Sequence, residues 1–539
     1  MEKITACRRL GTMVDCSRNA VMRPEKVEEW IDLTSSLGYN CLMLYTEDTY
    51  EIDGEPYFGH LRGRYSQEEL RRLDDYANAK DIELIPCIQT LAHLKQIFEW
   101  PAYQNDMRDF NDILMVGEER VYALIDKMFA MIHNTFRAKV VNIGMDEAHM
   151  LGRGRYLNRN GLRDRSEILM EHLNRISQIA KKYDLELIMW GDMFFRIASG
   201  GEYYVDHLEI SDKVKAMVPD NVNLIYWDYY SVEPEHYTKQ IQYHAAIKEG
   251  IWFAGGLWCW SGFAPHNTFA LETMSLAMDS CLAYGIENIF MTMWGDNGGE
   301  CSRFAMLPAL YYVAQRAKGI QDMQTIKEGF CKQFGIPFDD FMLLDLPGTP
   351  NEKEKKIVNP DKYMLYSDCF LGKFDSRVGE QQAKSYGICA DKLEKWKDHP
   401  VYGGLFTTMQ ALCRVMEIKF DLGVRTRQAY LSGSREALQA LTGEYTRLEE
   451  RVEHFYKVYR EQWLAENKPF GFEVQDLRLG GLCKRIGHCR ERLQAYLDGT
   501  LDRIEELEAP VLDIRGAENM AGEALEFNSW AQSVTANVI

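Results

Sequence analysis

The chain has 539 residues, more than one hydrophobic core usually supports, so we expect at least two domains. Its composition, 46% hydrophobic and 27% charged, is that of an ordinary globular protein and excludes wholesale disorder. A formal net charge of -19 argues against a nucleic-acid partner, because phosphate binding requires a basic surface.

The first residues, MEKITACRRLGTMVD, contain no apolar stretch of signal-peptide length, and no other window approaches the roughly 20 apolar residues of a membrane span. The 13 cysteines are odd in number and scattered, and several lie in apolar runs, which favours buried free thiols in a reducing compartment. No CxxC pair and no H-x-H or H-E-x-x-H spacing occurs. We therefore expect a cytoplasmic protein with no membrane partner, no metal and no cofactor.

Short apolar runs alternate with longer amphipathic stretches over the first 320 or so residues, which is typical of repeated βα units. The predicted strands are residues 11–15, 41–45, 83–88, 140–144, 186–190, 223–227, 251–255 and 288–294. The predicted helices between them include residues 24–38, 66–80, 119–136, 166–183, 237–250 and 270–285. The first of these opens on Pro24, which suits a first helical turn, and closes on Gly38.

Eight strands, each followed by a helix, are the number that closes a (β/α)8 barrel. A doubly wound open sheet is the alternative, but it usually carries a Gly-rich phosphate turn, and neither GxGxxG nor GxxxxGK[ST] is present. After about residue 330 the pattern changes: residues 341–363 have linker composition, and helical periodicity without strands follows. We predict a catalytic barrel over residues 1–330 and an α-helical domain over residues 331–539.

Polar and aromatic residues follow the predicted strands, at the end where a barrel gathers its active site. They are Asp15, Arg18, Glu47, Asp48, Gln89, His93, Asp146, Glu147, His149, Trp190, Asp192, Trp227, Asp228, Tyr229, Tyr230, Trp258, Trp260, Trp294, Asp296 and Asn297. A pyranose has one apolar face that stacks on an indole ring and a rim of hydroxyl groups that carboxylates, Arg and His bind. Carboxylates ringed by tryptophans therefore predict a sugar site.

The strongest local signal is NIGMDEAH, residues 142–149, where an apolar strand stops in the adjacent acids Asp146 and Glu147. Neighbouring residues on an extended segment point in opposite directions, so this pair is not expected to face each other across one glycosidic bond as nucleophile and acid. A 2-acetamido sugar carries its own nucleophile, the amide carbonyl oxygen. In that scheme Glu147 protonates the leaving oxygen, while Asp146 orients the amide N–H and balances the charge of the cyclic oxazolinium intermediate.

This motif and the order of the barrel resemble the family 20 glycoside hydrolases, the β-N-acetylhexosaminidases, over roughly residues 10–318. The similarity includes DCSRNAV at residues 15–21, ELIPCIQTLAH at residues 83–93, and MWGD at residues 189–192 and 293–296. It implies an exo-acting, retaining enzyme that removes terminal β-linked GlcNAc or GalNAc. It also implies that His93 binds substrate, that Trp190 and Trp294 form pocket walls, and that Asp296 binds a hydroxyl group.

The chain departs from the family's pattern in its first two strands. Leu10 stands where an arginine is usual, so Arg18 or Arg9 is expected to bind O3 and O4. The second strand ends in YTED rather than H-x-H, as in the shorter, intracellular-type branch without an N-terminal β-rich domain. The predicted substrate-binding residues are Arg18, Glu47, His93, Trp190, Trp227, Tyr229, Tyr230, Trp258, Trp294 and Asp296, with either tyrosine as the partner of the acetamido oxygen.

Other functions remain open at this point. A conventional two-carboxylate glycosidase would need a further acid opposite Glu147, and Asp296 or Asp228 would supply it. A non-catalytic sugar-binding barrel is the alternative from another class, although binding modules seldom retain both members of an acid pair. A metal-dependent hydrolase is not favoured, because the usual histidine spacings are missing. The helical segment is expected to pack as a domain, and it would also allow a homodimer.

Overall fold

The computed structural model describes residues 7–205, 212–350, 358–379, 381–514, 516 and 525–533, and the chain forms two compact units. The first, called the barrel unit here, comprises Met1–Leu257, Ala270–Gly295 and Ala309–Ile326. The second, called the helical unit, comprises Trp258–Phe269, Asp296–Pro308 and Lys327–Ile539. Two short segments between residues 258 and 308 thus belong to the helical unit, although the chain on either side of them belongs to the barrel unit.

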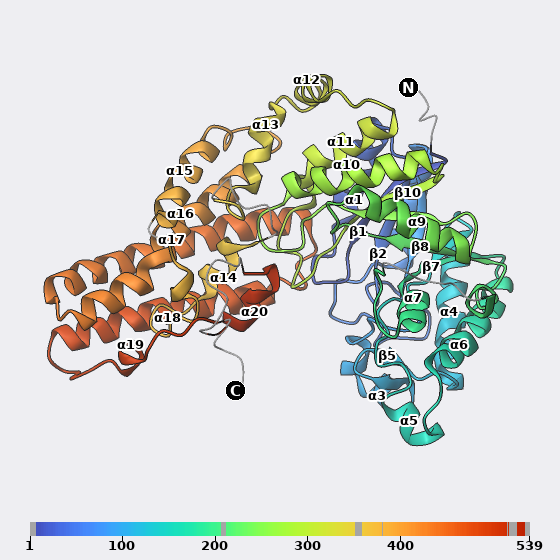
Figure 1. Ribbon diagram of the computed structural model, residues 1–539, viewed down its shortest axis with the longest axis horizontal. Coiled ribbons are helices and arrows are strands. Elements are labelled where there is room, and N and C mark those ends of the chain that lie inside the picture. Colours follow the sequence, from blue (N-terminus) through green and yellow to red (C-terminus); the bar gives the residue numbers. More distant parts are fainter. Residues whose placement is uncertain are drawn as a thin grey trace. The chain divides into compact units, whose positions relative to one another are not determined.

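The parallel strands of the barrel unit close into a barrel in the order β1-β10-β9-β8-β7-β6-β3-β2 (Figure 1). They are β1 (Arg9–Asp15), β2 (Cys41–Tyr45), β3 (Glu83–Cys87), β6 (Val140–Asn142), β7 (Glu186–Trp190), β8 (Val222–Trp227), β9 (Trp252–Gly256) and β10 (Asn288–Met293). β1 pairs on one side with β2 and on the other with β10, so that Gly11 lies opposite both Cys41 and Phe290. The predicted barrel is confirmed and the open sheet is excluded.

The strands are buried along almost their whole length, with every residue of β2, β9 and β10 inside. Strands of a parallel barrel are covered by helices on the outside and by packed side chains on the inside, so they read as near-continuous apolar runs. That is why the sequence located each strand to within two residues of its observed bounds.

The predicted helices of the barrel unit are present. They are α1 (Pro24–Leu37), α2 (Gln67–Ala79), α4 (Glu119–Thr135), α6 (Arg165–Lys181), α9 (Pro234–Ile247) and α10 (Asn267–Ala283), and α11 (Leu307–Ala317) follows β10. The first residues of α10 and α11 belong to the helical unit. Pro24 begins α1, and Gly38 ends it in the left-handed conformation at φ 97°. Ser66 and Glu69 form a reciprocal capping box at the start of α2.

Three connections contain elements that the sequence did not predict. Between β3 and α4 lie α3 (Pro101–Met107) and the antiparallel pair β4 (Arg108–Phe110) and β5 (Ile113–Leu114). The connections after β6 and β7 contain α5 (Arg155–Asn160), α7 (Asp192–Ser199) and α8 (Asp212–Lys215). Each of these elements is too short for a hydrophobic period to be recognised.

The helical unit contains α12 (Met323–Phe334), α13 (Phe338–Phe341), α14 (Pro360–Tyr366), α15 (Gln382–Glu394), α16 (Gly403–Leu431), α17 (Arg435–Glu466), α18 (Glu473–Leu497), α19 (Glu505–Glu508) and α20 (Trp530–Ser533), α12 beginning in the barrel unit. The long helices pack in sequence, α15 on α16, α16 on α17 and α17 on α18. The predicted helical C-terminal region is confirmed, and the predicted boundary at residue 330 stays a prediction.

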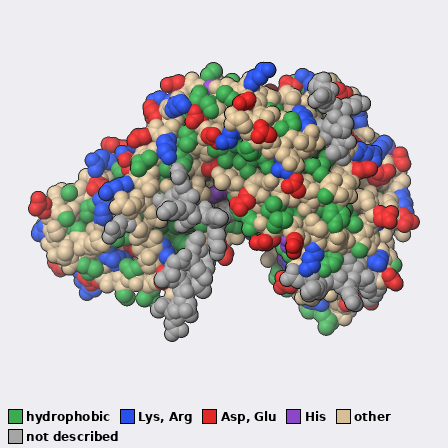
Figure 2. Space-filling view, turned by 45° about the horizontal axis from the view of Figure 1, so that its top comes forward, with side chains coloured by type: hydrophobic (Ala, Val, Ile, Leu, Met, Phe, Trp, Pro, Cys, Tyr) green, Lys and Arg blue, Asp and Glu red, His purple; other side chains and the backbone are tan. Residues whose placement is uncertain are grey.

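All thirteen cysteines are free thiols, and eleven of them are buried. Their burial fits the apolar runs in which they occur. Among the described residues, no helix has both the length and the apolar character of a membrane span. On the face drawn in Figure 2, basic and acidic side chains are interspersed, without a large area of one sign.

Candidate active site

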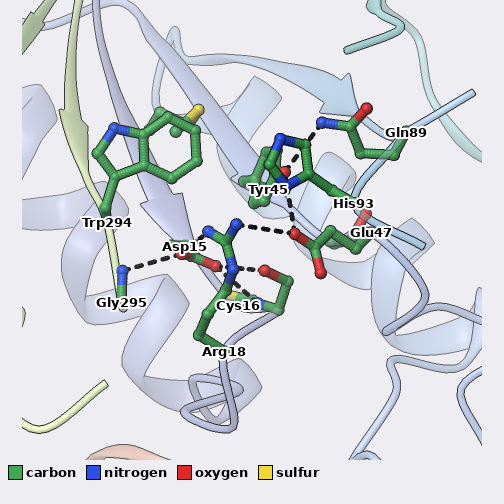
Figure 3. Close-up of polar contacts among 12 residues, drawn as sticks. Asp15, Cys16, Arg18, Tyr45, Glu47, Gln89, His93, Trp294 and Gly295 are labelled. Carbon is green, nitrogen blue, oxygen red and sulfur yellow. Dashed lines mark hydrogen bonds and ion pairs between the residues drawn. The ribbon is translucent and has the colours of Figure 1, made fainter. Parts of the chain in front are cut away.

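Asp15, the last residue of β1, links this strand through its carboxylate to the residues that follow β10. One of its carboxylate oxygens accepts hydrogen bonds from the Ser17 amide and hydroxyl, at 2.8 and 2.7 Å. The other accepts from the Gly295 amide at 2.8 Å and from the Arg18 guanidinium at 2.9 Å (Figure 3). Asp15 is only 1% exposed, so it acts as a buried anchor that sets the position of Arg18.

Arg18 and Glu47 form an ion pair at the carboxyl end of the barrel, with Nη2 and Oε1 3.1 Å apart. The Tyr45 hydroxyl donates to the same Glu47 oxygen at 3.0 Å, and the guanidinium lies over the rings of Tyr45 and Trp294 (Figure 3). Burial raises the pKa of Glu47 to about 7, although the charges of Arg18 and His93 oppose this rise. A carboxyl group that titrates near neutral pH is a candidate functional group.

Arg9, the other arginine considered for the sugar hydroxyls, lies at the opposite end of β1. It pairs with Glu83, the first residue of β3, at 2.6 Å. Because parallel strands run in one direction, their first residues and their last residues lie at opposite ends of the barrel. Arg9 is therefore a partner of Glu83 at the amino end, and Arg18 is the arginine at the end where a barrel carries its active site.

Asp146 is buried and held on both of its oxygens. Oδ1 accepts a hydrogen bond from Gln89 Nε2 at 2.8 Å, and Oδ2 lies 3.1 Å from His93 Nε2. The Glu147 carboxylate also approaches His93 Nε2, at 3.8 Å, but its side chain is 43% exposed. The two neighbouring acids thus have different environments: Asp146 is fixed by donors, whereas Glu147 is open to solvent.

The backbone turns sharply at this pair, which corrects one step of the sequence interpretation. Gly144, Met145 and Glu147 have φ values of 71°, 71° and 51°, so residues 144–147 are not an extended segment. One ring nitrogen of His93 and one carboxylate oxygen from each of Asp146 and Glu147 consequently lie within 4.8 Å of one another. The two carboxylates converge on one side instead of pointing in opposite directions, because left-handed residues reverse the alternation of a strand.

Gly144 fits against Gln89, and no larger residue does. A Cβ atom on Gly144 would lie 2.0 Å from Gln89 Oε1. The buried Gln89 side chain is not free to move, because it donates to Tyr45 and Asp146 and accepts from the Met145 amide at 3.1 Å. Gly144 therefore allows the turn that brings Asp146 under Gln89.

Replacing Gly144 by Ala is expected to lower the free energy of unfolding by about 1–3 kcal/mol more than Gly250→Ala does. Both glycines have φ near 70°, so both variants carry similar left-handed strain, but a Cβ on Gly250 meets nothing within 4 Å. Denaturant unfolding of both variants measures the difference. Equal losses would mean that the contact with Gln89 is unimportant.

The pKa values of His93 and Asp146 depend on the charge of the other residue. Burial alone lowers the pKa of His93, but the charge of Asp146 and the hydrogen bond to it outweigh burial and raise the pKa well above its usual value. Burial alone raises the pKa of Asp146, but the charge of His93 and hydrogen bonds from His93 and Gln89 lower it below its usual value. His93 and Asp146 therefore form an imidazolium–carboxylate pair at neutral pH.

Asp192, which follows β7, holds the backbone of Glu147. Its Oδ2 accepts the Glu147 amide N–H at 3.1 Å and the Arg196 Nε–H at 3.1 Å. Burial and then the charge of Asp146 raise the pKa of Asp192 to about 7. The sequence placed Asp192 and Gln89 at strand ends without a role, and strand-end position was the only signal that marked them.

Aromatic rings line the same end of the barrel unit. Trp190 and Trp294 have centroids 5.9 Å apart, and Trp294 Nε1 donates to the Tyr229 hydroxyl at 3.1 Å. Trp227 stacks on Tyr229, with centroids 5.5 Å apart. Tyr229 is 6% exposed and the adjacent Tyr230 is 44% exposed. The structure thus joins four of the predicted aromatic residues into one wall and leaves Tyr230 at its solvent side.

Three further predicted residues are Asp228, Trp258 and Asp296. Asp228 is fully buried and accepts hydrogen bonds from Tyr226 and the Tyr230 amide, with His236 2.6 Å away, so it is not an open carboxylate. Trp258 and Asp296 belong to the helical unit, where Trp258 stacks on Trp260 with centroids 4.2 Å apart.

Two family models match separate parts of the chain. Residues 9–245 match the family described as "Glycosyl hydrolase family 20, catalytic domain", and residues 339–526 match the "Glycoside Hydrolase 20C C-terminal domain". Hexosaminidase D of Bos taurus is 27% identical over 223 residues, which are 38% of this chain and 60% of that protein. Hexosaminidase D of Homo sapiens is 24% identical over 217 residues, 38% of this chain and 42% of that protein. The chain thus spans less than two thirds of either relative.

Solved structures show the same kind of similarity. A GH20 exo-β-N-acetylglucosaminidase from Vibrio harveyi, in complex with N-acetylglucosamine, is 16% identical and has a TM-score of 0.47, covering 63% of this chain and 58% of that one. A β-N-acetylhexosaminidase from Bacteroides fragilis is 16% identical with a TM-score of 0.46, covering 62% and 71%. With both of its parts matched by models of one family, the chain belongs to glycoside hydrolase family 20.

Proposed function

We propose that the chain is an exo-acting β-N-acetylhexosaminidase that removes terminal non-reducing β-linked GlcNAc or GalNAc with retention, through a substrate-assisted, oxazolinium mechanism. Family membership supports the hexosaminidase activity. The observation that carries the mechanism is the contrast between the two acids. Asp146 is buried with both oxygens engaged by Gln89 and His93, whereas Glu147 beside it is exposed.

In the first step, Glu147 donates its proton to the glycosidic oxygen, and the bond from that oxygen to the anomeric carbon breaks. The acetamido carbonyl oxygen of the same sugar attacks the anomeric carbon and forms the oxazolinium ring. Asp146 accepts the amide N–H through its remaining lone pairs and balances the positive charge of the ring. Because Asp146 is buried and held, it stabilises this charge without having to reorganise.

In the second step, Glu147 removes a proton from a water molecule, which attacks the anomeric carbon. The bond from that carbon to the amide oxygen breaks, the acetamido group is restored, and the sugar leaves with retained configuration. His93 stays protonated in both steps, since its raised pKa keeps the imidazolium beside Asp146. Its role is to keep Asp146 ionised and in place.

Around this pair we assign the sugar ring to the aromatic wall and its hydroxyl groups to Arg18 and Glu47. Trp294, which packs against the buried Trp190, is the candidate for the apolar face of the sugar, and Tyr229 is the candidate for the acetamido oxygen because its hydroxyl lies beside Trp294. The Arg18–Glu47 pair offers both donors and acceptors, which suits O3 and O4. We further infer that the enzyme acts on small cytoplasmic carbohydrates, while a homodimer stays a prediction.

A conventional retaining β-glycosidase is a second candidate, because the atoms of the two carboxylates lie within 4.8 Å and retaining pairs are about 5 Å apart. In that mechanism Asp146 attacks the anomeric carbon. Its two engaged oxygens disfavour this role, since Asp146 as a nucleophile must first give up the hydrogen bond from Gln89 or the ion pair with His93.

A single set of assays tests the proposal. We expect turnover of aryl N-acetyl-β-glucosaminide or galactosaminide, little turnover of the matching 2-hydroxy glucoside or galactoside, and competitive inhibition by a thiazoline that mimics the bicyclic intermediate. Equal turnover of the 2-hydroxy glycosides would favour the conventional mechanism. Binding of the sugars without any turnover would reject an enzyme and favour a sugar-binding barrel.

Glu47→Gln is expected to remove a pH dependence centred near 7. Because the pKa of Glu47 is raised to about 7, the carboxyl is protonated below this pH and becomes an ionised partner of Arg18 and of sugar hydroxyls above it. The ratio of kcat/KM between wild type and variant should therefore rise as the pH increases from about 6 to 8. Taking the ratio removes every contribution to the pH dependence that both proteins share. A constant ratio would contradict this assignment.

A further inference from the structure

Two residues of helix α7, Asp192 and Arg196, form an ion pair that holds the backbone of Glu147 (Figure 1). Asp192 begins the helix and Arg196 lies one turn later, so one short helix carries both members of the pair. We propose that the Arg196–Asp192 pair positions the backbone of Glu147 so that its carboxyl group reaches the glycosidic oxygen. This inference rests on the proposed function, in which Glu147 is the proton donor.

The side chain of Glu147 has little support of its own. It is 43% exposed, and its carboxylate accepts no hydrogen bond from the described residues, with His93 Nε2 3.8 Å away. A long side chain with few contacts can adopt several rotamers, and the backbone sets the direction from which they start. The direction of the proton donor therefore depends on how the backbone of Glu147 is fixed.

Two hydrogen bonds fix that backbone in its left-handed conformation, at φ 51°. The Glu147 carbonyl accepts from the His149 amide at 2.6 Å, and the Glu147 amide donates to Asp192 Oδ2 at 3.1 Å. The first bond closes a turn within residues 147–149, whereas the second joins this turn to the residues that follow β7. Because a left-handed residue with a Cβ atom costs energy, such contacts are needed to keep it in place.

The other acid of the site is held by different contacts. The amide that donates to Asp192 belongs to the peptide between Asp146 and Glu147, but the Asp146 carboxylate accepts from Gln89 at 2.8 Å and lies 3.1 Å from His93. Loss of the Arg196–Asp192 pair should therefore displace Glu147 more than Asp146. Protonation of the leaving group would suffer, while stabilisation of the oxazolinium charge would be largely kept.

Arg196 keeps Asp192 suited to this role. Asp192 is fully buried, and burial raises its pKa to about 7, a rise that the charge of Arg196 opposes. An ionised carboxylate accepts the Glu147 amide N–H more strongly than a protonated one. Arg196 is itself fixed, because its Nη1 donates to the Gly201 carbonyl at 3.2 Å and its guanidinium lies 5.7 Å from the centroid of the Tyr203 ring.

Asp192→Leu removes the acceptor and keeps a side chain of similar size. For an N-acetyl-β-glucosaminide with a poor leaving group, kcat/KM should fall by about 10- to 100-fold, because a displaced acid protonates the glycosidic oxygen poorly. For the 2,4-dinitrophenyl glycoside the loss should be at least about fivefold smaller, and thiazoline inhibition should weaken by less than about threefold. Equal losses for both leaving groups would indicate a general packing role and overturn the inference.

Asp192→Asn is the matched variant that restores an acceptor without the charge. Its amide oxygen is able to accept from the Glu147 amide and from Arg196 Nε, and its NH2 group replaces Oδ1, which has no hydrogen-bond partner among the described residues. For the poor leaving group, kcat/KM of Asp192→Asn should exceed that of Asp192→Leu by at least about fivefold. Equal values in the two variants would overturn the role of the acceptor.

Arg196→Gln tests the pair without changing Asp192, and so also decides the question if Asp192→Leu does not fold. We expect kcat/KM to fall by at least about threefold for the poor leaving group and by less for the dinitrophenyl glycoside. Arg72→Gln is the control, since Arg72 pairs with Glu28 on exposed helices, and its kinetics should equal those of the wild type. An unchanged ratio between the two substrates in Arg196→Gln would overturn the role of Arg196. Failure of the wild type to cleave either substrate would instead reject the proposed function.

Discussion

Replacing Glu147 by Gln is expected to lower kcat by about 10²- to 10⁴-fold for an N-acetyl-β-glucosaminide with a poor leaving group. Gln has nearly the same shape but no proton to give, so the glycosidic oxygen leaves as an alkoxide. With a 2,4-dinitrophenyl glycoside the loss in kcat/KM should be far smaller, because that leaving group departs without protonation. Steady-state kinetics across a series of aryl leaving groups measures both effects.

Glu186→Gln is the matched control for this variant. Glu186 is an exposed residue at the first position of β7, and the chemical change is the same, but it lies at the amino end of the barrel. Its kinetics should equal those of the wild type. Normal rates in Glu147→Gln, or a loss that does not depend on the leaving group, would reject Glu147 as the proton donor.

The barrel was predictable because burial on both sides makes each strand a continuous apolar run, visible without an alignment. The segment from α3 to β5 and helix α7 were not predictable, because they contain no long apolar run. Their few residues are shaped by contacts with other parts of the fold, such as the Asp109 carboxylate of β4, which accepts from the amides of Gly152 and Tyr156 in the connection after β6. A local pattern does not contain contacts of this kind, which join residues far apart in the sequence.

The candidate site was predictable as a set of strand ends, since a parallel barrel brings all of them to one end. Its internal geometry was not. The choice between Arg18 and Arg9 follows from which end of β1 each residue occupies and from the partners Glu47 and Glu83. The convergence of Asp146 and Glu147 follows from left-handed backbone that only the three-dimensional turn reveals.

The roles of Gln89 and Asp192, which hold the two acids in position, were the hardest to predict from the sequence. Gln89 is a neutral amide in an apolar context, and its importance comes from three simultaneous hydrogen bonds to Tyr45, Asp146 and Met145. Such a group has no motif, because its partners come from the ends of two other strands, β2 and β6. It nevertheless decides how Asp146 is held, and so which of the two mechanisms Asp146 is able to perform.

Asp146→Asn is therefore expected to lower kcat for N-acetyl-β-glucosaminides by about 10²- to 10³-fold, and to weaken thiazoline inhibition by a similar factor. A neutral amide neither balances the oxazolinium charge nor accepts the acetamido N–H as strongly. Because the variant also leaves the His93 imidazolium without its buried counter-charge, its folding must be checked by thermal unfolding. Asp184→Asn is the matched control, since Asp184 is exposed in the turn before β7 and Asn tolerates its left-handed φ of 55°.

The substrate itself distinguishes the two mechanisms for Asp146. In the substrate-assisted route, fluorinating the acetyl group weakens the attacking carbonyl oxygen, so wild-type kcat/KM should fall steeply from N-acetyl to N-trifluoroacetyl glycosides. If Asp146 were the nucleophile, fluorination would change the rate little, and Asp146→Asn would abolish turnover of 2-acetamido and 2-hydroxy glycosides alike. A buried carboxylate whose two oxygens are held by Gln89 and His93 is better placed to stabilise a cation than to attack carbon. A flat response to fluorination would contradict that reasoning.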